Sequence, residues 1–368
     1  MRRGLVFVAL AAVLLAQTPA PRQKWRVKFF HDKDDTAISF VDLTFVSPTL
    51  GMAAGYLVQT ERRAAPQGIA EITTDGGMRW SQVKLPDVPV SLFALDQGNV
   101  WLVGQEHIWK SNEFGRAWTK LGKLRGALKV HFLTEKRGFA VGVPKAIWRT
   151  EDGGVKWTKV PEAEVPQTKV ENTAYTDITF LNSKRGIISG FSKPPRRRDQ
   201  RVPDWMDPDQ RRAQVPNVTI TLETADGGKT WNPSTVSAFG QLTRVVFGPS
   251  GGLSVVEYTD SFEYSSEVLL LDFRNGKNTR SFREKDRVVK DVAIDKLGRG
   301  LLGSIERKGQ MGHLPIPGRL RIYQSLDLLK WAEMDVDYKA VANSVALATG
   351  DAQARFAATD TGMILKYE

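Results

Sequence analysis

An eight-residue motif that recurs along the chain constrains the fold more than any other feature of the sequence. Its pattern is Ser/Thr-x-Asp-x-Gly-x-x-Trp, and we call it the box. The copies are Thr73–Trp80, Ser111–Trp118, Thr150–Trp157 and Thr224–Trp231, with a worn copy at Ser325–Trp331 that lacks the glycines and is one residue short. Each copy lies between two short β-rich runs, so the sequence predicts a hairpin with the box at its turn.

The residue types of the box suit a tight, stabilised turn. An aspartate accepts hydrogen bonds from turn N–H groups, glycine supplies a positive φ, and tryptophan fills a wedge between neighbouring sheets. We assign this structural role to Asp75, Gly77, Trp80, Glu113, Gly115, Trp118, Asp152, Gly154, Trp157, Asp226, Gly228, Trp231, Asp327 and Trp331. Each box has only one or two carboxylates, whereas calcium takes six to eight oxygens, so the sequence predicts no metal site at the boxes.

A second pattern precedes each box: an apolar strand, a turn, and a small-residue strand that contains glycine. The pattern occurs in seven units, which begin at Val41, Leu92, Val130, Ile178, Val245, Val292 and Val345. Without a leader of roughly 20 residues and an insert, about 46 residues remain per unit, near the ~40–45 of a four-stranded propeller blade. The absence of long helical periodicity predicts an all-β fold. Seven blades fit best, with six or eight as alternatives.

The two ends of the chain predict how the ring closes. The last unit stops at Gly362–Glu368, a third strand with no box after it, and Lys24–Phe30 has the character of the missing fourth strand. An N-terminal strand that completes the last blade would remove an open sheet edge. In the fifth unit the box is replaced by a different turn, which contains Asn275-Gly276.

The first 20 residues indicate export. Met1-Arg2-Arg3 is basic, Leu5–Leu15 is apolar, and Ala16–Ala20 is rich in small residues, as in a signal peptide; an uncleaved anchor is the alternative. We expect residues 21–368 to form a single propeller in the periplasm or outside the cell, with no later transmembrane segment. The chain has no cysteine and a net charge of +11, which favours acidic partners or an anionic membrane surface. It carries no nucleic-acid-binding motif, so we expect no nucleic-acid partner.

The boxes and the Gly-x-Ala-x-Gly strands, such as Gly51–Gly55 and Gly138–Gly142, resemble those of the BNR/Asp-box propellers. Within that group the chain is similar to the exported seven-bladed photosystem II assembly and stability factor-like family. The resemblance implies a non-enzymatic scaffold that binds a protein partner, a membrane protein among the candidates, outside the cytoplasm. The box indicates the fold far more specifically than the function.

The segment 192–216 interrupts the fourth unit between its second and third strands, so we expect it to project from the rim. It is basic and proline-rich and carries one tryptophan. The predicted partner-binding residues are Arg196, Arg197, Arg198, Arg201, Trp205, Arg211 and Arg212. Arginines would pair with carboxylates or phosphates, and Trp205 would be an apolar anchor. The alternative is a solvated surface loop without a binding role.

A sialidase-like glycoside hydrolase is the alternative function on the same fold. It would need a carboxylate pair with arginines and a tyrosine at the mouth of the central channel. Glu257-Tyr258 and Glu263-Tyr264 offer such residue types, but no Arg-Ile-Pro segment precedes the boxes. The four histidines, His31, His107, His131 and His313, have no metal-ligand spacing. We therefore predict a non-catalytic monomer that needs no cofactor.

Overall fold

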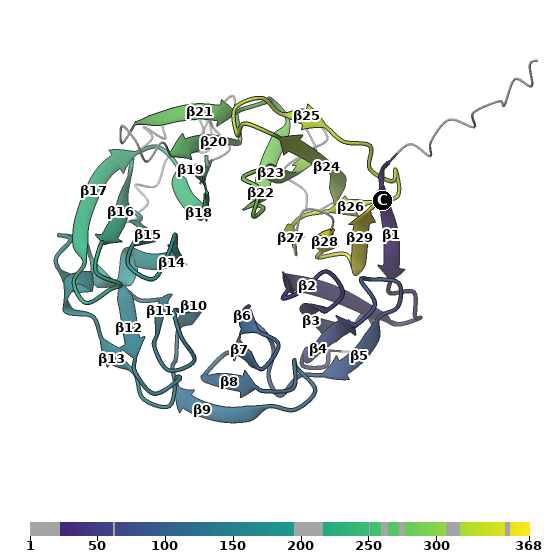
Figure 1. The fold of residues 1–368 in the computed structure, drawn as a ribbon, viewed down its shortest axis with the longest axis horizontal. Coiled ribbons are helices and arrows are strands. Elements are labelled where there is room, and N and C mark those ends of the chain that lie inside the picture. Colours follow the sequence, from purple (N-terminus) through teal and green to yellow (C-terminus); the bar gives the residue numbers. More distant parts are fainter. Residues whose placement is uncertain are drawn as a thin grey trace, which may run out of the picture.

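The computed structural model describes residues 23–61, 63–194, 216–249, 251–258, 264–271, 277–306, 317–349 and 354–368. In this part of the chain seven antiparallel sheets surround a central axis (Figure 1), and the helical elements are two short 3-10 helices, η1 (Pro161–Glu164) and η2 (Val170–Asn172). Within each blade the strands follow one another outward from the axis. The predicted seven-bladed propeller is confirmed.

The first four blades are complete in sequence order. Their strands are β2 (Thr36–Phe45), β3 (Gly51–Gln59), β4 (Gln67–Thr73) and β5 (Ser81–Lys84); β6 (Ser91–Asp96), β7 (Asn99–Val103), β8 (His107–Ser111) and β9 (Thr119–Lys123); β10 (Ala127–Phe132), β11 (Gly138–Gly142), β12 (Ala146–Thr150) and β13 (Thr158–Lys159); β14 (Thr173–Phe180), β15 (Gly186–Ser192), β16 (Asn217–Thr224) and β17 (Asn232–Ala238).

Blades five to seven follow the same order, except that the last blade takes its outer strand from the N-terminus. Their strands are β18 (Gln241–Gly248), β19 (Gly251–Glu257), β20 (Ser266–Leu271) and β21 (Asn278–Phe282); β22 (Arg287–Ile294), β23 (Gly300–Glu306), β24 (Gly318–Ser325) and β25 (Ala332–Glu333), with β26 (Val341–Ala342) also paired to β24; β27 (Val345–Thr349), β28 (Arg355–Thr359), β29 (Met363–Tyr367) and β1 (Trp25–Phe30).

The ring closes through β1, as predicted from the chain ends. β1 pairs antiparallel with β29, and Trp25 lies opposite Tyr367. Lys24 N donates to Glu368 O at 2.8 Å, and Glu368 N donates to Lys24 O at 3.1 Å. The Trp25 side chain is fully buried in a cluster built from blades six and seven, so the closing strand is anchored by apolar packing as well as by its hydrogen bonds.

The boxes form compact turns held by side chain to backbone hydrogen bonds. In the first, Thr73 Oγ1 accepts from Gly77 N at 2.8 Å, and Asp75 Oδ1 accepts from Met78 N and Arg79 N at 2.9 Å each. Bonds of the same kind recur in Thr150–Trp157 and Thr224–Trp231. These N–H donors, Arg79 first, lower the pKa of the Asp75 carboxyl.

The other two copies depart from this geometry. In Ser111–Trp118 the hydroxyl of Ser111 accepts from Gly115 N at 2.7 Å and from Glu113 N at 3.2 Å, and no turn N–H of this described segment bonds to the Glu113 carboxylate. In the worn copy Asp327 Oδ1 accepts from Leu329 N at 2.9 Å and from Lys330 N at 2.7 Å. A turn can therefore keep its shape with either the hydroxyl or the carboxylate as the main acceptor.

Aromatic side chains pack the blades against one another beside the boxes. Phe356 of blade seven stacks on Phe45 of blade one with 4.0 Å between ring centroids, and the box residue Trp80 meets Phe356 edge-on at 6.3 Å. The same arrangement brings Phe139 of blade three against Trp231 of blade four at 5.5 Å. Gly228 has φ +77°, and a Cβ there would lie 2.3 Å from the Phe139 ring, so this box position requires glycine for two reasons.

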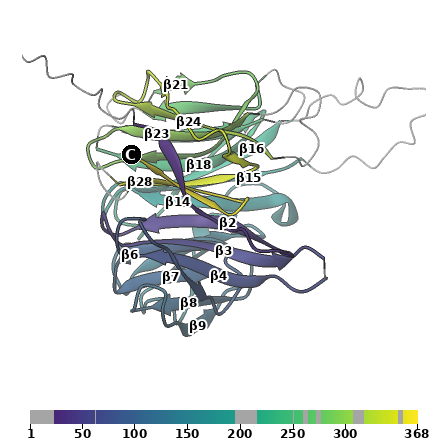
Figure 2. The same ribbon diagram turned by 90° about the vertical axis from the view of Figure 1, so that its right-hand side faces the viewer.

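The propeller has two different faces, because turns alternate between the two ends of each antiparallel sheet. We call the face that carries the boxes, together with the turns between first and second strands, the box face. Its two sets of turns are bonded to each other: Gly153 N donates to Lys136 O and Gly227 N to Lys184 O, both at 2.7 Å. The opposite face, which we call the loop face, carries the connections between second and third strands and between blades; the β3–β4 hairpin extends from it (Figure 2).

Candidate functional site

The innermost strands place one residue each at an equivalent register position around the axis. These residues are Asp42, Ser91, Lys129, Asp177, Arg244, Asp291 and Ala346. In five of the strands a bulge immediately precedes this residue, and all five of those residues are charged. We call the charged members the inner ring. A bulge re-aims a side chain, which explains how charged groups come to lie among buried strands.

The three aspartates of the inner ring join neighbouring blades. Asp42 accepts from Leu43 N in its own strand at 2.9 Å and from Leu92 N of blade two at 2.8 Å. Asp177 bridges in the same way to Val245 N of blade five at 2.7 Å, and Asp291 bridges to Leu347 N of blade seven at 2.8 Å. Each carboxylate therefore uses both of its oxygens to connect one inner strand to the next.

The two cations of the inner ring pair with two of these aspartates. The ammonium of Lys129 bonds to Asp177. Arg244 Nε lies 2.9 Å from Asp291 Oδ1, and Arg244 Nη1 lies 3.9 Å from Asp177 Oδ1. Burial by itself would raise the pKa of Asp177, but Lys129 and Arg244 hold that pKa below its ordinary value. Asp42 forms no ion pair with a described residue, and burial raises its pKa.

His131 follows Lys129 by two residues and is enclosed by two aromatic rings. Its ring centroid lies 4.8 Å from that of Phe93 and 5.1 Å from that of Phe180. Burial, with Lys129 as a second cause, lowers the pKa of His131 to about 4, so the imidazole is neutral at physiological pH. Among the described residues no group of three or more His, Asp or Glu side chains is arranged to hold a metal ion, and His313 lies outside them.

The glutamate and tyrosine of the hydrolase alternative have different partners. Glu257 Oε1 accepts from Lys290 Nζ of β22 at 2.9 Å. Tyr258 follows β19, the second strand of blade five, and its hydroxyl donates to Glu267 Oε1 at 2.5 Å. Arg280 and Arg283 both pair with the same carboxylate, at 3.4 and 3.7 Å. Tyr264 packs under Arg283 with 4.2 Å from ring centroid to guanidinium, and Glu263 lies outside the described residues. This cluster is an ion-paired hairpin away from the inner strands.

The predicted binding residues of the insert, Arg196, Arg197, Arg198, Arg201, Trp205, Arg211 and Arg212, all lie outside the described residues. The two ends of the insert are fixed, however, at the loop face between β15 and β16. Lys193 N donates to Asn172 O at 3.0 Å, Thr173 Oγ1 to Ser192 Oγ at 3.0 Å, and Asn217 Nδ2 to Gly240 O at 3.2 Å. The strands that flank the insert in sequence, β15 and β16, are the second and third strands of blade four. The projection of the insert from the rim stays a prediction.

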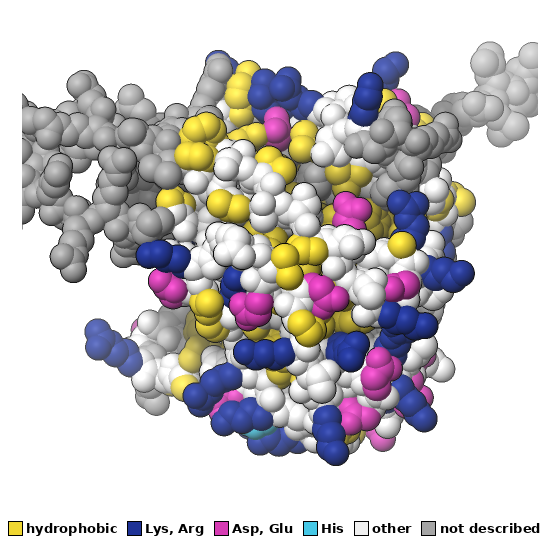
Figure 3. Space-filling view, turned by 90° about the vertical axis from the view of Figure 1, so that its left-hand side faces the viewer, with side chains coloured by type: hydrophobic (Ala, Val, Ile, Leu, Met, Phe, Trp, Pro, Cys, Tyr) yellow, Lys and Arg dark blue, Asp and Glu magenta, His cyan; other side chains and the backbone are white. Residues whose placement is uncertain are grey.

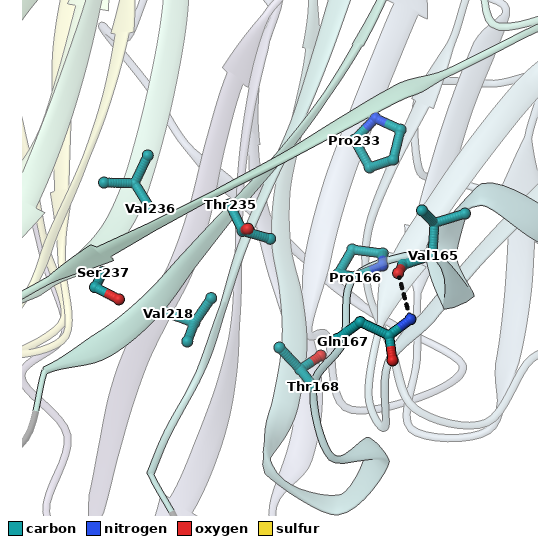
Figure 4. Close-up of a pocket in the computed structure, with 9 residues that line it drawn as sticks. All are labelled: Val165, Pro166, Gln167, Thr168, Val218, Pro233, Thr235, Val236 and Ser237. Carbon is teal, nitrogen blue, oxygen red and sulfur yellow. Dashed lines mark hydrogen bonds between the residues drawn. The ribbon is translucent and has the colours of Figure 1, made fainter.

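A groove of about 370 Å³ lies beside the point where the insert leaves the blade (Figure 4). One wall is the segment between η1 and η2 and the other comes from β16 and β17. The lining residues are Val165, Pro166, Gln167, Thr168, Val218, Pro233, Thr235, Val236 and Ser237. Val165 and Val236 are exposed, at 55% and 62%, so the groove offers aliphatic surface with hydroxyls at its edges. We call it the blade-four groove.

A buried lysine holds the first wall of the groove in place. Lys145 Nζ donates to Pro166 O at 2.9 Å and to Glu164 O and Thr168 O at 3.3 Å each, and the residue is only 5% exposed. The hydroxyl of Tyr175 donates to Ala163 O at 2.7 Å and fixes the other end of the same segment. The groove is therefore preformed rather than made by a loose loop.

The side of the molecule that carries β17 mixes basic, acidic and hydrophobic side chains (Figure 3).

Comparisons with known proteins identify the fold. No protein-family model and no curated protein sequence matches the chain. Among solved structures, YCF48 bound to a D1 peptide is similar with a TM-score of 0.60 and 16% identity over 95% of this chain and 96% of that one. YCF48 from Cyanidioschyzon merolae gives 0.59 and 14% over 94% and 98%.

A glycoside hydrolase family 74 xyloglucanase from Xanthomonas campestris also matches, with a TM-score of 0.58 and 12% identity. The match covers 93% of this chain but 53% of the xyloglucanase. Identities this low show a shared propeller fold and leave the activity open. In the described part of the chain, no helix is long and apolar enough to span a bilayer.

Proposed function

We propose that this protein is a non-catalytic, exported scaffold of the photosystem II assembly factor-like type, which binds a segment of a partner protein on its loop face. The observation that carries the proposal is how the inner-ring carboxylates are hydrogen-bonded. Asp42, Asp177 and Asp291 each accept, with both carboxylate oxygens, hydrogen bonds from backbone N–H groups of two blades. A general acid or a nucleophile needs a carboxylate that can reach substrate, and these three connect strands instead.

The blade-four groove and the insert beside it are the proposed contact. The groove supplies aliphatic walls, and the insert supplies the arginines and Trp205 that would pair with an acidic, partly apolar segment. The full-length similarity to YCF48, one structure of which is bound to a D1 peptide, supports a peptide-like ligand. Basic contacts predict capture that weakens as salt rises.

The test is affinity capture from the native envelope fraction with three forms of the protein. In one form residues 195–215 are replaced by a short Gly/Ser linker, which keeps Ser192 and Asn217 with their hydrogen bonds. In a second, Val236→Asp places a charge in the groove. The control, Val90→Asp, changes an exposed valine of blade two that lies outside the groove. We expect the first two to lose most of the captured partner and the control to retain it; undiminished capture by both would refute the proposal.

A glycan-active hydrolase is the second candidate, favoured by the match to the xyloglucanase. Its test is turnover of xyloglucan and of a fluorogenic sialoside by the purified protein. We expect none. Turnover that disappears in Asp42→Asn, the inner-ring carboxylate without an ion pair among the described residues, would replace the scaffold proposal with the enzyme.

A further inference from the structure

The box face carries large apolar side chains at the tips of its turns. They lie in the boxes of blades one, three and six and in the first turn of blade six, and all are strongly exposed. They are Met78 (70%), Val155 (53%), Leu297 (67%), Leu326 (79%) and Leu329 (46%). In the boxes the hydroxyl residue is buried and the Asp75, Asp152 and Asp327 residues are exposed. Hydrogen bonds from backbone N–H groups to these carboxylates hold the residues before the tryptophan at the surface.

A lysine or arginine is the immediate neighbour of four of the five tips. Arg79 follows Met78, Lys156 follows Val155, Lys296 precedes Leu297 and Lys330 follows Leu329, whereas Leu326 precedes Asp327. Within the described residues none of these four cations forms an ion pair. Lys136, Lys184 and Lys229, in the turns of blades three and four, add further cations without an ion pair to a described residue. The box face therefore presents apolar tips in blades one, three and six with cations beside four of them, among the exposed carboxylates of the boxes.

Exposed apolar residues of the loop face have charges of both signs beside them. Val165 follows Glu164, Val170 lies between Lys169 and Glu171, and Tyr338 lies between Asp337 and Lys339. The Lys339 ammonium lies 5.9 Å from the centroid of the Tyr338 ring. A cation next to an apolar tip favours contact with an anionic surface and a carboxylate disfavours it, so these loop-face tips have a weaker net attraction than the four box-face tips that have a cation as neighbour.

The start of the propeller lies on the box face. Lys24 is bonded to Glu368 at the box-face end of blade seven, so the propeller begins on this side. The basic and apolar leader Met1–Ala20 precedes it in the sequence and lies outside the described residues.

From the tips, the cations and the position of the chain start, we infer that the box face rests on an anionic lipid surface. Aliphatic tips insert at the headgroup level while neighbouring lysines and arginines contact phosphates, the combination by which peripheral proteins bind membranes. The loop face, with the blade-four groove, then points away from the bilayer. The inference concerns which face of the protein contacts the membrane, and its test does not depend on whether a partner is captured.

The absence of native cysteine allows a direct test on the full chain. Met78→Cys and, separately, Tyr338→Cys are labelled with an environment-sensitive fluorophore and mixed with vesicles of equimolar phosphatidylglycerol and phosphatidylcholine. We expect the emission at position 78 to strengthen and shift to the blue, and that at position 338 to stay unchanged. Equal responses, or a response at position 338 alone, would overturn the inference. The test decides orientation whether or not the leader is present.

A charge-matched pair of triple variants measures the electrostatic part. One combines Arg79→Gln, Lys156→Gln and Lys330→Gln; its control combines Lys33→Gln, Lys169→Gln and Lys339→Gln on the loop face, and matching circular dichroism spectra establish folding. We expect the first to partition into these vesicles about a hundredfold more weakly and the control to bind as the parent does. An equal loss of vesicle binding in both variants would overturn the inference. No loss in either variant would also overturn it, and would leave an acidic protein as the alternative partner of the box face.

Discussion

A buried glutamate in blade one should make the propeller less stable as pH rises. Glu71 lies in β4 between Ala70 and Ile72 and is 2% exposed. It shares the side of the strand occupied by Ile69, which packs in the apolar cluster between blades seven and one. Its one side-chain hydrogen bond comes from Gln82 Nε2 at 3.0 Å. Burial raises the pKa of the Glu71 carboxyl to about 7.

The magnitude follows from the difference between folded and unfolded chain. A pKa raised from the ordinary 4.5 to about 7 corresponds to about 3 kcal/mol of stability, at 1.36 kcal/mol for each pKa unit. Below pH 4 the group is neutral in both states and costs nothing. As pH rises from 4.5 to about 7 the unfolded chain ionises before the folded one, so stability falls over that range and reaches its lower plateau near pH 8. Glu71→Gln keeps the shape and the amide-to-oxygen bond but cannot ionise.

The assay is urea unfolding followed by tryptophan fluorescence at intervals from pH 5 to pH 8.5. Glu71→Gln should exceed the parent by about 1 kcal/mol at pH 5 and by about 3 kcal/mol at pH 8.5. Glu113→Gln, an exposed glutamate with no turn hydrogen bond to its carboxylate, is the control and should follow the parent throughout. Parallel profiles for the parent and Glu71→Gln would refute the argument that blade one buries an ionisable carboxyl.

Three further substitutions test how the blades are joined. Gly228→Ala should lower the free energy of unfolding by about 3 kcal/mol in a thermal melt, because φ is +77° and the added Cβ would lie 2.3 Å from an aromatic ring of the preceding blade. The control, Gly98→Ala, has 3.5 Å to its nearest neighbour and should leave stability nearly unchanged. Trp25→Ala empties a fully buried site in the closing strand and should lower stability by about 3–5 kcal/mol, with no change in the aromatic packing of other blades as seen by near-ultraviolet dichroism. Asp177→Asn should lower the free energy of unfolding in urea by about 2 kcal/mol more than Asp42→Asn, since both lose one bridging acceptor but only the first removes a carboxylate that is paired with Lys129 and, at 3.9 Å, with Arg244. Equal losses would contradict an electrostatic contribution.

The ring, the number of blades and their closure could be predicted because each depends on local signals that repeat. The box identifies a turn from within eight residues, and seven spaced copies of an apolar strand pair set the blade count. Closure by Lys24–Phe30 followed from the missing fourth strand after Gly362, and β1 pairs there with β29. These features require no knowledge of contacts between blades.

The inner ring was missed because no single unit reveals it. Asp42, Lys129, Asp177, Arg244 and Asp291 each look like one charged residue within an apolar strand. Aligning the units on their glycine strands puts Asp42, Lys129, Asp177 and Asp291 nine residues before the first glycine, and Arg244 eight residues before Gly252. That recurrence of charges is the signal that sequence reasoning could have used. What the alignment cannot supply is the bulge that aims each side chain at the next blade.

The blade-four groove depends on contacts that could not be predicted from the sequence. Its first wall is a linker between blades, held by Lys145 through three carbonyl groups that are 19 to 23 residues away in the chain. Lysine is a common surface residue, so nothing local marks Lys145 as a buried clamp. The arginines of the insert, predicted as binding residues, stay a prediction.

The geometry of a blade sets the height at which a partner would be captured if the box face rests on lipid. β16 runs from the box at Thr224 to the groove residue Val218, and Asn217 to Thr224 at about 3.3 Å per residue spans roughly 25 Å. The groove therefore lies about 20 Å above the lipid headgroups. A segment that leaves a membrane-spanning partner needs about six extended residues to reach it. Capture should thus map to a terminal tail or a long loop of the partner, and a binding site within a few residues of a membrane span would be incompatible with the groove, the orientation, or both.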